Sequence, residues 1–246
     1  MIQSKPLPGS DPPEPGFPGR WLGAASLILG PLLLLTGVVL RLRFDFFFPA
    51  QLEAAAAHPT LMFAAYSAFL GGVILLWPGI IVLAQRIGRT HPRWGLWGAA
   101  LVIFGLFART FHAGADHLAF QLVRIEGVEP AVRVIQSSYG APHIVKTLNA
   151  AILFGWLVLA VGAYRSRTLG LVRSVALALM AGLMMGILKG SSMISVVSAA
   201  GLCVALVPLG VETLRADPRP RLRAFLGWSL AAAAGVGAMY LIGQAG

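Results

Sequence analysis

Seven apolar runs dominate the sequence, each near the roughly 20 residues that a helix needs to cross the hydrocarbon core of a bilayer. Hydrophobic residues make up 57% of the 246 residues and charged residues 11%, whereas soluble domains carry about 25% charged residues. We therefore predict an all-α integral membrane protein, a bundle of about seven transmembrane helices in the lipid bilayer. The predicted helices lie at about 21-40, 60-84, 94-115, 144-164, 170-188, 192-210 and 225-243.

The first nineteen residues differ from the rest of the chain. Residues 1-19 hold six prolines and three glycines, a composition that buries too little apolar surface to order itself. We predict a disordered, Pro-rich cytoplasmic arm at 1-19 and a single polytopic membrane domain at 20-246. The Ala, Gly, Leu and Arg bias is typical of a high-GC bacterium, which would make this a multi-pass protein of a bacterial cell membrane.

The basic residues predict an orientation. With the N-terminus inside, twelve of the 19 Lys and Arg residues fall on cytoplasmic segments, and the three inner loops are short and almost purely basic. This is the pattern that orients membrane helices, so we predict N-in, C-out. The net charge of +10 therefore lies in short loops rather than on a folded basic face, which argues against a nucleic-acid partner.

Four of the five histidines fall on the opposite, outer side of this topology. The sharpest piece is a stripe on the third apolar run and its extension, where Arg109, His112 and Asp116 lie within about 60° of one another on a helix. The neighbouring His117 points about 100° away from Asp116. A guanidinium in the outer half of a bilayer is costly, so Arg109 should face the bundle interior and have a partner.

The stripe is compatible with three kinds of site. At i and i+4, the Asp116 carboxylate could hold the His112 imidazole in one tautomer, or both could bind a divalent metal such as zinc. A catalytic zinc has three protein ligands, and His117 points away, so a further group such as His143 or Glu53 would be needed. Metal-free acid-base chemistry and a purely structural polar network are the alternatives.

Two neighbouring segments could complete the outer cluster. His143 and Lys146 share a helical face at the start of the fourth run, and Lys146 could pair with Asp116 or Glu53, or snorkel to the interface. The sequence FDFFFPAQLEAAAAHP predicts an interfacial helix that begins at Pro49 and could place Glu53 over the outer mouth. A solvated connector is the alternative for this segment.

Two remaining features predict helix packing. The fifth run carries Gly182, Gly186 and Gly190 at four-residue spacing, a small-residue stripe on which a neighbouring helix can pack. The single cysteine, Cys203, lies in an apolar stretch and is expected to be an inert packing residue.

These observations lead to one function hypothesis and two alternatives. The hypothesis is a membrane-embedded enzyme that acts on a lipophilic small molecule in an outer-facing polar pocket. The alternatives are a transporter or proton-coupled permease and a noncatalytic membrane partner such as an immunity subunit. The candidate catalytic residues are His112, Asp116, His117, Arg109, His143, Lys146 and Glu53.

Overall fold

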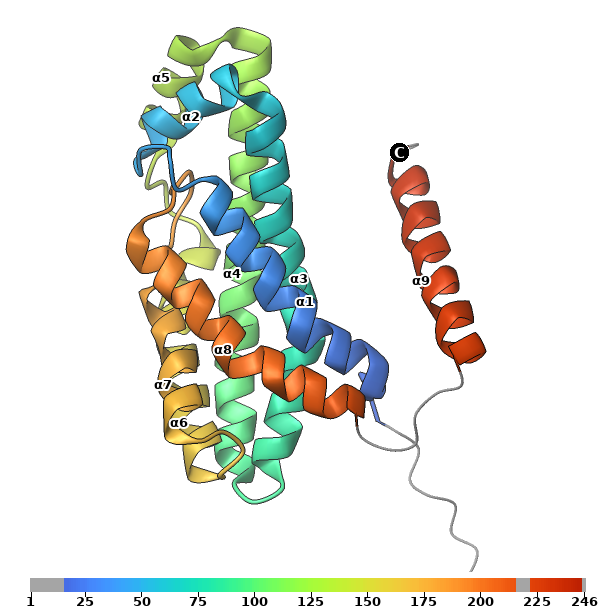
Figure 1. The fold of residues 1–246 in the computed structure, drawn as a ribbon. Coiled ribbons are helices and arrows are strands. Elements are labelled where there is room, and N and C mark those ends of the chain that lie inside the picture. The colour runs from blue at the N-terminus through green and yellow to red at the C-terminus, as the bar shows by residue number, and fades with distance from the viewer. Residues whose placement is uncertain (1–15, 216–221, 245–246) are drawn as a thin grey trace, which may run out of the picture. The chain divides into compact units, whose positions relative to one another are not determined.

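The computed structural model describes residues 16–215 and 222–244, and within these ranges every regular element is a helix (Figure 1). Five helices are long and apolar enough to span a membrane, which confirms an all-α, multi-pass membrane class of protein. They are α1 (Gly19–Leu40), α3 (Pro59–Gly88), α4 (Pro92–Glu126), α6 (Asn149–Arg165) with its 3-10 turn η1 (Ile144–Leu148), and α8 (Met193–Arg215).

The remaining elements are shorter, except the last helix. They are α2 (Phe48–Ala57), α5 (Val128–Ser138), α7 (Leu171–Ala178) with the 3-10 turn η2 (Leu179–Gly182), and α9 (Leu222–Gly243). The helix predicted to begin at Pro49 corresponds to α2, in which Pro49 lies in the first turn. No sequence signal was assigned to α5, although its apolar residues recur at helical spacing after a chain reversal at Gly127, whose φ is +89°.

The chain divides into two compact units, Met1–Leu214 and Arg215–Gly246. The second unit contains α9, which covers the predicted run 225-243. Most of the predicted arm 1-19 falls outside the described residues, and α1 already begins at Gly19.

Glycines let the helices of the first unit pack closely. In Figure 1, α3, α4 and α6 lie alongside one another, and α1 and α8 cross them obliquely. A Cβ on Gly105 would lie 3.0 Å from Cα of Ile152, and a Cβ on Gly155 2.8 Å from N of Val102, so the α4 and α6 backbones nearly touch. Such small-residue contacts drive helix association in lipid, where burial of apolar surface gives no driving force between helices.

Gly72 provides a direct test of this packing. A Cβ at Gly72 would lie 2.6 Å from the backbone N of Leu34, whereas a Cβ at Gly71 would meet only Leu33 Cδ1 at 3.8 Å. We expect Gly72→Ala to lower the free energy of unfolding in detergent by about 1–3 kcal/mol, because the α1 backbone must move away. Gly71→Ala is the matched control and should leave the melting temperature unchanged or higher. Equal melting temperatures for the two variants would contradict this packing of α1 on α3.

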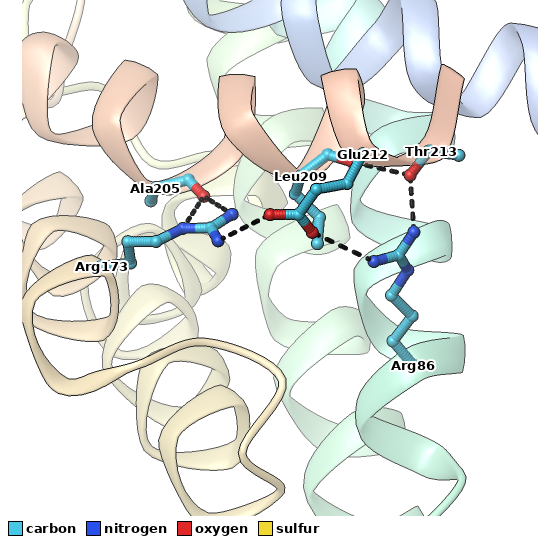
Figure 2. Close-up of polar contacts among 6 residues, drawn as sticks. All are labelled: Arg86, Arg173, Ala205, Leu209, Glu212 and Thr213. Carbon is cyan, nitrogen blue, oxygen red and sulfur yellow. Dashed lines mark hydrogen bonds and ion pairs between the residues drawn. The ribbon is translucent and has the colours of Figure 1, made fainter. Parts of the chain in front are cut away.

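A charge network ties three helices together at one end of the first unit (Figure 2). Glu212 on α8 forms ion pairs with Arg173 Nη1 of α7 at 3.3 Å and with Arg86 Nη1 of α3 at 3.8 Å. Arg86 also donates to Thr213 Oγ1 at 2.6 Å, and Arg173 donates to the Ala205 carbonyl at 2.9 Å. Because Glu212 is half exposed, the ion pairs themselves add little stability, and their effect is to fix the mutual register of the three helices.

We call this end of the first unit the basic end. Besides the Glu212 network, Arg165 lies over the Trp94 ring at 5.7 Å, and Arg20 donates to the Leu214 carbonyl at 3.0 Å. The start of α1, the end of α3, the start of α4, the end of α6 and the end of α8 therefore meet here. Within the first unit, the described Arg residues that the sequence assigns to one side of a membrane thus include Arg20, Arg86, Arg165 and Arg173 at this end.

A second, smaller apolar core caps the opposite end. At about 1.5 Å per residue, the 35 residues of α4 extend about 52 Å, well beyond a hydrocarbon layer about 30 Å thick. The far end of α4 packs with α2 and α5. The buried residues of this cap are Leu52, Ala119, Val123, Ala131 and Leu188.

Candidate functional site: a polar cavity at a helix break

The predicted helix 170-188 is wrong beyond Gly182. The α-helical part ends at Ala178, η2 ends at Gly182, and residues 183–192 form an irregular segment before α8 begins. Gly186 and Leu188 have φ values of +116° and +51°, which no α-helix contains. The predicted glycine stripe therefore does not form a helical packing face. We call residues 183–192 the break segment.

Charged side chains of α4 bind the backbone of the break segment. Arg109 is only 5% exposed and donates from Nη1 to the Met184 carbonyl and from Nη2 to the Leu183 carbonyl, both at 2.9 Å. The Asp116 Oδ1 atom accepts a hydrogen bond from the Leu188 N–H. These bonds replace the helical hydrogen bonds that the segment lacks, which explains how irregular backbone is tolerated inside a membrane protein.

The predicted stripe on α4 does face the interior. Arg109, His112 and Asp116 are all buried, with at most 7% of each residue exposed, whereas His117 is exposed on another face of α4. The expectation that Arg109 finds a partner is confirmed, and its partners are backbone carbonyls rather than a carboxylate. The structure gives no hydrogen bond between His112 and Asp116.

Arg41 is a second buried guanidinium at this site, and sequence reasoning placed it only in a loop. It follows α1 directly, is 4% exposed, and donates from Nε to the Gly37 carbonyl at 3.1 Å. Its guanidinium lies over the rings of Tyr66 and Phe69, 4.3 Å and 4.8 Å from their centroids. Its position four residues after Gly37, at the end of an apolar run, was the available signal.

The helix α2 and the loop that precedes it pack against the break segment. The fully buried Gln51 donates to the Asp45 carbonyl at 2.6 Å and accepts from the Tyr66 hydroxyl at 3.1 Å. Gly190 donates its N–H to the Phe46 carbonyl at 2.9 Å, and a Cβ on Gly190 would lie 2.7 Å from Gln51 Nε2. Gln51 was not predicted as a site residue, because a lone Gln in an Ala-rich helix carries no distinguishing pattern.

These elements line a partly open polar cavity of about 30 Å³, large enough for a water or a small polar group. His112 lines this cavity, and the described part of the chain supplies no hydrogen bond to its ring nitrogens. Ser191 also lines it, and its buried Oγ has no hydrogen-bond partner. The polar and charged lining residues are Arg41, Arg109, His112, Asp116, Lys189, Ser191 and Ser195.

The other predicted site residues lie outside the cavity lining. His143 is half-buried, and its ring centroid is 4.9 Å from that of Phe111. Lys146 is exposed and donates to the Gly140 carbonyl, so it pairs with neither Asp116 nor Glu53. Glu53 is exposed on α2 and has no ion pair among the described residues. The structure therefore brings together three of the seven predicted residues.

The residues present do not fit the zinc site that the sequence suggested. Across the described ranges, no group of three or more His, Cys, Asp or Glu side chains is placed to hold a metal ion. His112 and Asp116 share the cavity, but the exposed Glu53 and His143, whose ring lies against Phe111, do not supply a third ligand.

Comparison of the chain with protein-family models, with curated proteins and with solved structures finds no match in any of the three.

Proposed function

We propose that the chain crosses the membrane seven times, N-in and C-out, and acts as an enzyme on the polar end of a lipophilic substrate at the cavity. The orientation is supported by the gathering of Arg86, Arg165 and Arg173 at the basic end of the first unit. In this topology α7, η2 and the break segment together make one crossing and α9 makes the last. The cavity then opens toward the outer side, beside a cap on which the exposed Phe47 side chain can enter the lipid interface.

His112 carries the proposal. Arg109 and Asp116 are engaged by the backbone of the break segment, whereas the His112 ring reaches the cavity with no hydrogen bond from the described chain. An imidazole that is held in place by a helix and available to a ligand is the usual general acid or base. The small cavity admits the reacting polar group while the apolar remainder of the substrate stays in the bilayer.

The test is lipid turnover by the purified full-length protein. Detergent-solubilised protein is incubated with a bacterial total lipid extract, and products are followed by mass spectrometry. We expect at least one lipid to be converted, with the rate falling about 10²–10⁴-fold in His112→Ala, the range typical for loss of a general acid-base group. His117→Ala is the matched control, since His117 is exposed on the same helix, and should retain the wild-type rate. Identical lipid profiles with wild type and His112→Ala would refute the enzyme proposal.

A permease is the second candidate, and the break segment is the observation that favours it. Interrupted helices form the solute sites of many transporters. Against it, a continuous apolar core that includes Leu27, Leu76 and Trp156 fills the first unit away from the cavity. Proteoliposomes loaded with a pH-sensitive dye and placed in a pH gradient distinguish the two functions. Proton flux above that of protein-free liposomes, lost in Asp116→Asn, would favour the permease.

A further inference from the structure

The cavity carries more positive than negative charge, and this excess points to its ligand. Three cationic side chains line it, from Arg41, Arg109 and Lys189, against the single carboxylate of Asp116. We propose that the cavity binds an oxyanion, the phosphate or carboxylate group of its ligand. This inference rests on the proposed function, because it names the class of substrate that the same cavity would take.

In the described part of the chain, none of the three cations forms a direct ion pair with a carboxylate, and Asp116, the one carboxylate in the lining, balances only one of the three charges. Within residues 16–215 and 222–244, the only ion pairs are those of Glu212 at the basic end. Arg41 and Arg109 are instead bound by neutral groups, the carbonyls of Gly37, Lys189, Leu183 and Met184. Carbonyls satisfy N–H donors but leave the net charge uncompensated, and buried charge in a membrane protein is ordinarily paired.

Two of the lining side chains, Ser191 and Lys189, are placed to donate to an anion. The Ser191 hydroxyl belongs to a residue that lines the cavity, is 95% buried and has an Oγ without any hydrogen-bond partner. The half-buried Lys189 ammonium is held only by the faces of Phe46 and Phe47, 5.3 Å and 4.7 Å from their centroids. Ammonium and hydroxyl donors of this kind make the charge-assisted hydrogen bonds that oxyanions accept.

Asp116 opposes an anion and so limits the charge that the cavity attracts. One of its oxygens is engaged by the Leu188 N–H, which directs part of its negative charge toward the break segment. With a volume of about 30 Å³, the cavity can enclose an oxyanion but not an acyl chain. The ligand is therefore either a free oxyanion or the anionic headgroup of a lipid whose chains remain in the bilayer.

Binding by the purified full-length protein tests the inference and separates the two sources. Equilibrium dialysis measures retention of ³²P-labelled inorganic phosphate, and native mass spectrometry compares retention of phosphatidylglycerol with that of the zwitterionic phosphatidylcholine. We expect saturable binding of phosphate or of phosphatidylglycerol, weakened about tenfold or more in Lys189→Gln, because a charge-assisted hydrogen bond is lost. Ser191→Ala should weaken it by a smaller factor.

Matched variants make the result specific. Arg43→Gln removes the same charge as Arg41→Gln from an exposed neighbour outside the cavity, and Ser137→Ala, at an exposed serine of α5, is the control for Ser191→Ala. Arg41→Gln should weaken binding and Arg43→Gln should not. If Arg41→Gln fails to fold, Lys189→Gln and Ser191→Ala decide, since neither side chain donates a hydrogen bond to the fold.

Phosphate binding would assign a free oxyanion, and selective retention of phosphatidylglycerol would assign a headgroup. Absence of both, or equal binding by wild type and Lys189→Gln, would overturn the inference. The proposed function is judged separately. His112-dependent turnover of a neutral lipid would support the enzyme proposal and contradict the oxyanion inference. Oxyanion binding without turnover would support the oxyanion inference and contradict the enzyme proposal.

Discussion

Replacement of Arg109 by Met is expected to lower the free energy of unfolding in detergent by about 3–5 kcal/mol. The substitution removes two hydrogen bonds from a charged donor, each worth about 1.5–3 kcal/mol, and leaves the Leu183 and Met184 carbonyls without their partner. Relief of a buried charge offsets part of this loss. Arg124→Met on the exposed surface of the same helix is the matched control and should change stability by less than about 0.5 kcal/mol.

A labelling experiment shows where the effect of Arg109→Met acts. With Cys203 replaced by Ser, a cysteine substituted for Ile187 reports on the break segment, because Ile187 packs against the cap. A membrane-impermeant maleimide should label this cysteine slowly in the parent protein and much faster when Arg109 is Met. Equal labelling rates, or equal stability of Arg109→Met and Arg124→Met, would show that Arg109 does not hold the break segment.

The class of the fold follows from hydropathy, and part of the site follows from helical periodicity. Lipid allows only helices or closed barrels to span, so long apolar runs separated by charged loops predict helices directly. The 100° step of a helix brings Arg109, His112 and Asp116 to one face, and the cost of burying a guanidinium turns that face inward. All three residues line the cavity in the structure.

Hydropathy does not predict the break in the run 170-188, because it measures the polarity of side chains and not the conformation of the backbone. The run is apolar, so the side chains permit a helix, but three glycines weaken it and the charged groups of α4 bind its backbone. The sequence does contain an indirect signal. Arg109 and Asp116 lie on a stripe that is expected to be buried, and the facing apolar runs offer no opposite charges to pair with them. Backbone groups are then the remaining hydrogen-bond partners.

Lys146 and Glu53 were predicted to join the outer polar cluster, and the structure places them outside it for a different reason. Their positions depend on loops, and loop geometry is fixed by turns that sequence patterns do not specify. Lys146 is used locally by the Gly140 carbonyl, and Glu53 lies on the exposed face of α2. Their places near the site are taken by Gln51 and Arg41, which sit one turn or less from element ends and carry no motif.

Asp116 has a structural role, as the acceptor for the Leu188 N–H, and an electrostatic role, as the negative charge of the cavity. Two substitutions of Asp116 distinguish these roles. Asp116→Leu leaves the fully buried Leu188 N–H without an acceptor, in a residue whose φ of +51° a Leu side chain disfavours. We expect this variant to lose about 2–4 kcal/mol of unfolding free energy and to label rapidly at a cysteine substituted for Ile187. Asp116→Asn keeps a carbonyl oxygen for the Leu188 N–H and should lose less than about 2 kcal/mol.

The same pair of variants predicts opposite effects on the ligand. Asp116→Asn removes the one negative charge from a cavity with three cations, so it should bind phosphate or phosphatidylglycerol more tightly than wild type while remaining folded. Asp116→Leu removes the same charge but releases the break segment that carries Lys189 and Ser191, so its binding should fall. Weaker oxyanion binding by a folded Asp116→Asn protein would contradict the electrostatic argument, because the substitution removes negative charge and adds only an amide NH2 donor, and both changes favour an anion.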